Sequence, residues 1–304
     1  VRPNLKAFAL VVDPPERIIA STGFAVLRAG ESILPEYLFV SILSDYAVNQ
    51  MIAQMGKGAY PSINQTDVQS VKIPLPPLEV QREIVAEIEG YQKLIEGARQ
   101  VVESWKPQIE IDPAWPMVKL EVVCDVRDGT HDSPKYVQQA GFPLITSKNI
   151  KKGNIDFTDV NLISKEDLTK INERSFVDDG DILMPMIGTI GNPIIVKKER
   201  EFGIKNVALI KFHKDTKVIN HYIKEILDSE LFNKHYQNQS AGSTQKFISL
   251  GFIRNLEIPL PPIEVQCEIV AKIEAERKVV DGCRDLISLY EAKIKKVIDR
   301  VWEA

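Results

Sequence analysis

Residues 73–89 read IPLPPLEVQREIVAEIE, and residues 258–274 read IPLPPIEVQCEIVAKIE. The two stretches differ at only three of 17 positions, so they form an internal repeat. The step from residue 73 to residue 258, here called the repeat offset, is far longer than the roughly 20 to 50 residues of solenoid repeats. The repeat therefore predicts two copies of a whole module, in which a domain is followed by a helix.

Weaker similarities continue upstream at the repeat offset. Residues 35–38 correspond to 220–223, and residues 58–63 correspond to 243–248. The second copy has the whole of 116–255 ahead of its helix, whereas the first has only 1–70, and its match begins near Arg17. We therefore expect that the first module, as it stands in this sequence, lacks the counterpart of its amino-terminal half.

Each repeated stretch predicts the end of a strand and the start of a helix. Proline cannot donate a hydrogen bond to a sheet, so Ile-Pro-Leu-Pro-Pro suits an extended exit from a strand. Glu79 and Glu264 then fall in a first helical turn, where acidic residues are favoured. Pro107 stops the first helix, whereas the second can run from about Glu264 to Glu303, roughly 60 Å.

Apolar residues recur along both predicted helices at alternating spacings of four and three. The first series is Ile84, Ile88, Tyr91, Ile95, Ala98, Val102 and Trp105. The second is Ile269, Ile273, Glu276, Val280, Cys283, Ile287, Tyr290, Ile294, Val297 and Val301, in which only Glu276 is polar. A period of 3.5 residues is typical of a coiled-coil seam. We expect the helices to pair as an antiparallel coiled coil; the alternative is that each packs on its own domain.

The segment between the helices is expected to be a mixed α+β domain. Short β-like runs alternate with glycine and proline turns, and helices are expected near 165–171 and over about 220–236. The predicted strands are 122–126, 143–146, 181–184, 194–196, 207–212 and 256–258. The fold class is therefore α+β, with two mixed domains, the first incomplete, separated by two long helices.

Three polar clusters on predicted turns of this domain carry groups that suit DNA. They are 127–132 (Arg127, Gly129, Thr130, His131), 147–149 (Lys148, Asn149) and 242–246 (Ser243, Thr244, Gln245, Lys246). Arginine and lysine can read guanine edges, asparagine and glutamine can read adenine edges, and hydroxyls or lysine can hold phosphate. Thr189 lies in a tight Gly-Thr-Ile-Gly turn, and Lys205 and Asn206 head a strand. The alternative is that these polar turns are only turns.

Composition excludes several classes of protein. No apolar run approaches the roughly 18 residues of a membrane helix, and three scattered cysteines predict neither a disulfide framework nor a zinc site. A reducing cytoplasm suits this cysteine usage. The net charge is −4, but segment 116–255 has 20 basic and 18 acidic residues and holds all four histidines. Any basic face for DNA must therefore arise from the placement of charges.

Motifs for catalysis are missing or incomplete. The sequence contains no GxxxxGK[ST], GxGxxG, HExxH or GxSxG, so a nucleotide motor, a metalloprotease and a hydrolase have no support. Asp13-Pro14-Pro15-Glu16 is similar to the Asp/Asn-Pro-Pro-aromatic motif of amino-methyltransferases, but Glu16 stands where the aromatic residue should be. We expect neither an enzyme nor a bound cofactor or metal.

Taken together, these stretches resemble the specificity subunits of type I restriction-modification systems. The resemblance rests on the repeated IPLPPxEVQxEIV with its heptad helix and on WPMVKL at 115–120. It also rests on RDGTHDSPK at 127–135, which adds Lys135 to the candidate DNA contacts, on PLITSKNI at 143–150 and on GDILM at 180–184. These stretches are spread over most of the chain.

The resemblance implies two target-recognition domains that each read one half of a split sequence in double-stranded DNA. It implies that the antiparallel helix pair sets their spacing, that methyltransferase subunits dock on the helical regions, and that restriction and motor subunits join that core. The expected organisation is the end of a first recognition domain (1–72), a helical region (73–111), a second recognition domain (112–257) and a second helical region (258–304). A coiled-coil adaptor that binds protein partners is the alternative.

Overall fold

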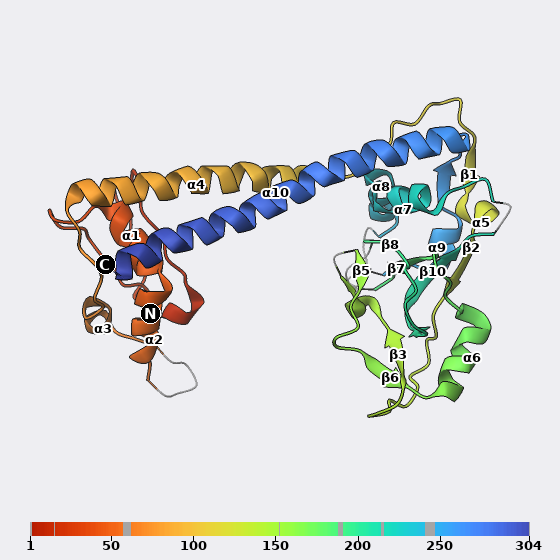
Figure 1. Ribbon diagram of the computed structural model, residues 1–304, viewed down its shortest axis with the longest axis horizontal. Helices are drawn as coiled ribbons and strands as arrows, with labels where there is room; N and C mark the ends of the chain where they lie inside the picture. The colour runs from red at the N-terminus through yellow and green to blue at the C-terminus, as the bar shows by residue number, and fades with distance from the viewer. Residues whose placement is uncertain are drawn as a thin grey trace. The chain divides into compact units, whose positions relative to one another are not determined.

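The computed structural model describes residues 2–14, 16–56, 62–151, 153–187, 191–213, 216–240 and 247–303. The chain forms two compact units (Figure 1). Unit 1 contains residues 1–104 and 280–304, and unit 2 contains residues 105–279. No helix in the described ranges is long and apolar enough to cross a membrane.

Unit 2 is built on a central antiparallel sheet in the order β2-β10-β7-β8. Its strands are β2 (Asp125–Asp128), β10 (Val207–Lys211), β7 (Ile182–Pro185) and β8 (Ile194–Ile195). A second sheet has the order β6-β3-β9, with β6 (Asn161–Ile163), β3 (Phe142–Ile145) and β9 (Gly203–Ile204). Two small pairs are β1 (Met117–Lys119) with β11 (Glu257–Pro259), and β4 (Ile150–Lys151) with β5 (Asn154–Ile155).

Both faces of the central sheet are buried. Strand β10 is accordingly apolar and fully buried at every position from Val207 to Ile210, and not only at alternate positions. Ala208 and Ile210 face one core, which the apolar sides of the unit 2 helices complete. Val207 and Leu209 face a second core with residues of β3 and β9.

The helices of unit 2 surround these sheets. They are α5 (Leu120–Val123), α6 (Lys165–Ser175), α7 (Asn220–Asp228), α8 (Glu230–Ser240) and α9 (Leu250–Arg254), together with the first part of α10 (Ile263–Glu303). The single strand predicted over 122–126 is wrong, because a turn of helix, α5, comes directly ahead of β2. The helix expected over 220–236 is interrupted at Ser229, whose extended backbone separates α7 from α8.

Unit 1 repeats the helical half of unit 2. Its helices are α1 (Pro35–Leu43), α2 (Asp45–Ala53), α3 (Gln65–Gln69) and α4 (Leu78–Ser104), preceded by η1 (Pro3–Leu5). Their first residues precede those of α7, α8, α9 and α10 by the repeat offset in every case, so the repeat seen in the sequence is a repeat of structure. The described residues of unit 1 contain no strand, so Ile-Pro-Leu-Pro-Pro at 73–77 does not leave a strand there, contrary to the prediction.

A buried glutamine fixes the start of each long helix. Gln81 is fully buried; its Nε2 donates to the backbone oxygens of Ser32 and Pro76, and its Oε1 accepts from the Leu34 amide. Gln266, its counterpart in the repeat, makes the same three bonds, to Lys217, Pro261 and Ile219. A buried amide is costly unless every group is paired, so this set of bonds ties each helix to the loop ahead of α1 or α7.

The apolar series of the long helices make both of the contacts that were considered for them: pairing with the other helix, and packing on a domain core. In unit 1, Ile84 and Ile88 of α4 are buried with Val297 of α10, and the Tyr91 and Tyr290 rings lie 5.2 Å apart. Ile269, by contrast, packs on the core of unit 2. Each long helix therefore has a partner helix along part of its seam, and α10 also has a domain core along another part.

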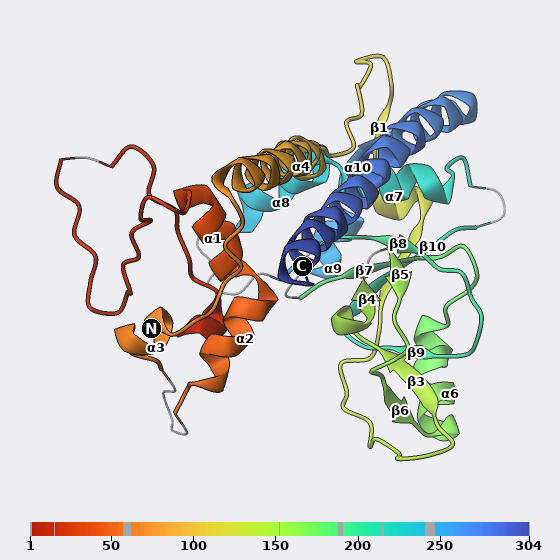
Figure 2. The same cartoon turned by 60° about the vertical axis from the view of Figure 1, so that its left-hand side comes forward.

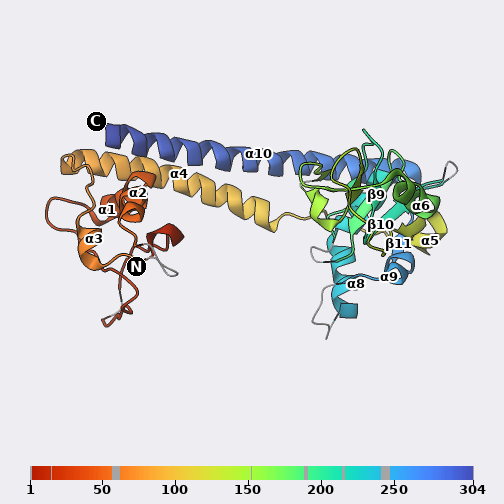
Figure 3. The same cartoon turned by 90° about the horizontal axis from the view of Figure 1, so that it is seen from below.

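Ion pairs show that α4 and α10 are antiparallel within unit 1 (Figure 3). Glu87, early in α4, pairs with Arg300, late in α10, whereas Arg99 pairs with Glu291. The remaining seam residues follow the predicted stripe: Ile95, Ile273 and Val280 are buried, while Val102, Ile287, Tyr290 and Ile294 are partly buried. Glu276, the polar position of the series, accepts a hydrogen bond from the Trp105 indole in unit 2.

Candidate DNA-recognition edge

The ends of three strands meet at one edge of the central sheet of unit 2. Asp128 at the end of β2 lies opposite Ala208, and Pro185 at the end of β7 lies opposite Val207. Both partners stand at the start of β10, because both pairs are antiparallel. The loops that follow β2 and β7 therefore leave the sheet beside the turn that leads into β10.

The second sheet brings its own loop to the same edge. Strands β3 and β9 are parallel, so Ile145 and Ile204 end side by side, and the Lys205 amide donates to the Ile145 oxygen. Thr130 forms a parallel bridge with Lys205. The turn η2 (Ser147–Asn149), which carries Lys148, follows β3 directly. Residues 128–135, 147–149 and 205–206, which lie far apart in the sequence, are thus neighbours; we name them the recognition edge.

Gly129 is required for this convergence. Its amide donates to the Val207 oxygen, and a Cβ placed on it would stand 2.3 Å from the Ile204 oxygen. Backbone contact at that distance cannot be relieved by a side-chain rotation. The glycine of the Asp-Gly-Thr-His stretch thus lets the β2 loop cross against the end of β9, a packing role that brings Thr130 and His131 to the edge.

A buried carboxylate organises the side chains of the edge. Asp128 is 6% exposed; one oxygen lies 2.7 Å from Nε2 of His131, and the other accepts from the guanidinium of Arg174 at the end of α6. The other imidazole nitrogen, Nδ1, lies 2.9 Å from Oδ1 of Asn206. Asn206 has a φ of 53°, in the left-handed region that asparagine tolerates better than most residues. Contacts from β2, α6 and the turn between β9 and β10 thus hold His131 and Arg174 in place, while both side chains remain largely exposed.

These contacts favour the imidazolium form of His131. The hydrogen bond to Asn206, the hydrogen bond to Asp128 and the charge of Asp128 raise its pKa above the usual 6.5, while desolvation and Arg174 oppose the rise. Because the folded-state pKa lies above the unfolded value, the stabilisation is complete below about pH 6.5 and is lost as the pH rises through the folded-state pKa. We expect the urea midpoint of unit 2 to fall over that interval, and expect His131→Gln to remove this step. If the urea midpoint of the His131→Gln protein fell with pH as in the original protein, the pH dependence would not be due to His131.

The lysines of the edge differ in how firmly they are held. Lys205 donates to Oγ of Ser133 at 2.7 Å, which fixes its ammonium group beside the β2 loop. Lys135 and Lys148 are exposed. With His131 and Arg174, these lysines give the edge several groups that carry or can carry positive charge, although segment 116–255 as a whole is close to neutral. The placement of charge, rather than its amount, makes this edge basic.

Two candidate residues are instead used inside the protein. The guanidinium of Arg127 binds Asp125 and the Arg174 oxygen, so its donors face its own domain. Asn149 is 6% exposed; its Oδ1 accepts from the amide and hydroxyl of Thr146, and its Nδ2 donates to backbone oxygens of the following loop. Asn149 therefore caps η2 in this structure and has no free edge to offer a base.

Part of the candidate set lies outside the described residues, namely Thr189, Ser243, Thr244, Gln245 and Lys246. Their described neighbours Ile187 and Phe247 pair with each other in an antiparallel bridge. Ile187 follows β7, whose end lies at the recognition edge. Both side chains are about half exposed.

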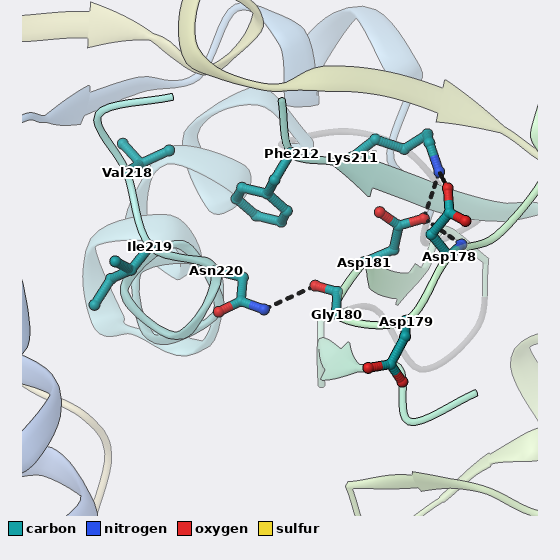
Figure 4. Close-up of a pocket in the computed structure, with 9 residues that line it drawn as sticks. All are labelled: Asp178, Asp179, Gly180, Asp181, Lys211, Phe212, Val218, Ile219 and Asn220. Carbon is teal, nitrogen blue, oxygen red and sulfur yellow. Dashed lines mark hydrogen bonds and ion pairs between the residues drawn. The ribbon is translucent and has the colours of Figure 1, made fainter. Parts of the chain in front are cut away.

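A polar pocket at the other end of β10 has a different character (Figure 4). Lys211 donates to Asp178 at 2.8 Å and to Asp181 at 2.6 Å, and Asn220 donates to the Gly180 oxygen. Burial raises the pKa of Asp181, against the effect of Lys211. The pocket is acidic and its cation is already paired, so it does not suit a phosphate backbone. Over the described residues, no group of three His, Cys, Asp or Glu side chains is placed to hold a metal ion.

Comparisons with known proteins point to one family. The family model described as type I restriction modification DNA specificity domain matches residues 7–104 and 114–279. The type I restriction enzyme MjaVIII specificity subunit of Methanocaldococcus jannaschii is 23% identical over 312 residues, covering 93% of this chain and 72% of that one. The EcoBI specificity subunit of Escherichia coli is 32% identical over 162 residues, 53% of this chain and 34% of that one.

A solved structure also resembles the whole chain. It comes from work on complex assembly and conformational transition of the type I R-M system, with a TM-score of 0.63, 25% identity, and coverage of 99% of this chain and 79% of that one. The fold and the matched segments define a non-catalytic class of protein, which recognises DNA sequence. The chain belongs to the type I restriction modification DNA specificity domain family, and DNA-sequence recognition is its function.

The sequence pattern predicts the loops of the edge but not its central groups. Asp128 lies within the predicted polar cluster 127–132 and Ser133 within the stretch 127–135, whereas Arg174 lies in neither. Arg174 lies far beyond Asp128 in the chain, in a helix whose polar face carries several charges. No local pattern distinguishes it from its neighbours; only the packing of α6 against β2 does.

Proposed function

We propose that the recognition edge of unit 2 contacts one half of a bipartite DNA target. The observation that carries this proposal is the convergence of the β2 loop, η2 and the β9–β10 turn, with Lys205 and His131 held by neighbouring side chains. Lysines that grip phosphates position a protein on DNA, while groups aimed at base edges provide the sequence preference. The fixed imidazole of His131 suits the second role, because little of its freedom is lost on binding.

We further propose the domain organisation given by the repeat. Residues 1–72 belong to a first recognition domain, 73–111 and 258–304 are the helical regions, and 112–257 form the second recognition domain. The shared bonds of Gln81 and Gln266 support equivalent junctions in the two halves. The antiparallel contacts of α4 with the end of α10 support a helix pair that spaces two readers.

The helical regions are the proposed docking sites for methyltransferase subunits, with restriction and motor subunits joining the complex. Support comes from apolar side chains that the helices leave exposed, among them Leu94, Val101, Val279 and Leu289. Exposed apolar groups along a polar helix surface favour a protein partner. Double-stranded DNA and these subunits are therefore the proposed partners.

Selection from a random duplex library tests sequence recognition. The chain assembled with its methyltransferase subunits should enrich one sequence in two parts separated by an unread spacer. Replacing His131 and Arg174 with alanine should relax the preference in the half that unit 2 reads and leave the other half unchanged. A pool that never converges would contradict sequence recognition, and an unchanged pattern with both substitutions would contradict the placement of the edge.

Salt dependence tests the lysines separately. If Lys205 and Lys148 each neutralise a phosphate, alanine at either position should weaken binding to all duplexes alike. The slope of log K against log salt should become shallower by about one for each. Lys119→Ala is the control, because Lys119 is exposed, donates to Asn255 and is not among the residues of the edge. Equal slopes for all three variants would remove both lysines from the interface.

A further inference from the structure

Two consecutive residues of β2 hold the end of α6 at the recognition edge. The Arg127 guanidinium donates to the backbone oxygen of Arg174 at 2.9 Å, and the carboxylate of Asp128 accepts from the Arg174 guanidinium. Deeper in the domain, Leu168 and Ile171 of α6 pack with apolar side chains of β3 and β6, which lie beside the helix in Figure 2. Both the backbone and the side chain of Arg174 are therefore fixed by the fold of unit 2.

Arg174 nevertheless keeps hydrogen-bond donors for a ligand. Its side chain is 65% exposed, whereas that of Asp128 is 8% exposed. Over the described residues, the ion pair with Asp128 is the one polar contact of this guanidinium. A guanidinium has five N–H donors in a rigid planar fork, so most of those of Arg174 remain available. The donors of Arg127, by contrast, are bound to Asp125 and to the end of α6.

The neighbouring carboxylate favours a base over a phosphate as the ligand of Arg174. Asp128 places a negative charge beside the guanidinium, which offsets its positive charge and would repel a phosphate. Lys205 is held by the neutral hydroxyl of Ser133, so its charge stays suited to a phosphate. A base edge is uncharged, and guanine presents two acceptors, O6 and N7, side by side in the major groove. Adenine presents N7 beside an amino donor, which a second N–H group of arginine would oppose.

We propose that Arg174 reads a guanine in the half-site that unit 2 contacts, with two N–H groups on O6 and N7 of the base, and that Asp128 is the positioning residue that directs them. This role depends on the proposed contact between the recognition edge and DNA, and it adds the base that one residue reads. An arginine side chain that is already held loses less rotamer freedom on binding than a free one. Its donors of fixed direction supply specificity, whereas the lysines of the edge position the protein on phosphates.

Modified bases in the selected target test the contact directly. The chain assembled with its methyltransferase subunits is given duplexes in which 7-deazaguanine replaces each guanine of that half-site in turn, on either strand. This analogue lacks the N7 acceptor but still pairs with cytosine. At one guanine we expect binding to weaken about fivefold or more, and we expect no such loss for Arg174→Ala. Inosine is the control base, because it keeps O6 and N7 and should be bound like guanine.

Two substitutions of Arg174 separate base reading from charge. Arg174→Ala should lose the discrimination at that position, which we expect to be about 5- to 150-fold in the original chain. Arg174→Lys keeps the charge but lacks the planar fork, so it should lose the same preference and keep the original salt slope. Lys165→Ala, at the exposed start of α6, is the control and should select the original target.

Asp128→Asn tests the positioning role. A neutral amide holds the guanidinium less firmly, so the preference for guanine should shrink although Arg174 is present. The preference at this position should fall more than at the other positions of the half-site, whereas a merely structural role of Asp128 would lower all of them together.

The remaining outcomes separate this role of Arg174 from the recognition edge itself. If 7-deazaguanine weakens the original chain at no position, or weakens Arg174→Ala equally, Arg174 does not read guanine. If Arg174→Ala binds all duplexes more weakly and its salt slope is shallower by about one, Arg174 holds a phosphate instead. In either case the edge stands if Lys205→Ala still alters binding, whereas a library that never converges overturns both proposals.

Discussion

Val297→Asp is expected to abolish the packing of α10 against α4 while leaving unit 2 folded. Val297 is 4% exposed and is buried with Tyr37, Ile84 and Ile88. The cluster contains no cationic side chain, and its two hydroxyl donors, on Tyr37 and Tyr91, already donate to the Pro74 oxygen and to Glu87, so a carboxylate at this position would lack a partner. Burying an unpaired charge costs several kcal/mol, about 3 to 5 when no partner is present. The helices should therefore separate rather than enclose it.

Calorimetry can measure this loss for each unit. The transition assigned to unit 1 should move to much lower temperature or vanish, while that of unit 2 keeps its midpoint. Leu289→Asp is the matched control, because Leu289 lies on the same helix and is 54% exposed. It should change the midpoint little. Equal effects of the two substitutions would mean that the seam does not hold unit 1 together.

Gly129→Ala is expected to destabilise unit 2 and to abolish DNA binding in the same variant. The added Cβ would meet the backbone of Ile204 and Lys205 at 2.3 to 2.8 Å. Backbone shifts of this kind typically cost about 1–3 kcal/mol and occasionally more. The shift would separate Thr130 from Lys205 and move His131 away from Asn206, so the edge would be lost even where the domain remains folded.

Gly282→Ala is the opposite case and serves as the control. Gly282 lies within α10, and a Cβ there meets nothing within 4 Å. Alanine in a helix interior should stabilise the protein by about 0.5–1 kcal/mol. Urea unfolding of both variants, with duplex binding by the assembled complex, measures the contrast. A Gly129→Ala protein with the original midpoint and affinity would show that close strand approach is not needed.

The sequence predicted well wherever the deciding information is local or repeated. The seam could be predicted because Ile84, Ile88 and Val297 belong to series with a period typical of a helix pair. The start of α10 was predicted to within one residue, since prolines and acidic residues mark it. Gln81 and Gln266 belong to the repeat, yet their role as buried junctions could not be foreseen, because bonds to backbone atoms far along the chain leave no pattern in the sequence.

By itself, the sequence determined the duplication, the approximate extent of the long helices, the α+β class and the loops that carry polar groups. Only the tertiary structure decided which of those groups remain available to contact DNA. Arg127 and Asn149 make hydrogen bonds within their own domain, while Arg174 of α6 binds Asp128 of β2. The physical reason is that periodicity and turn chemistry act over a few residues, whereas a recognition edge is assembled by strand pairing. Strand β2 pairs with β10 from Asp125 opposite Lys211 to Asp128 opposite Ala208, across about half of unit 2 in sequence, and no local pattern encodes that pairing.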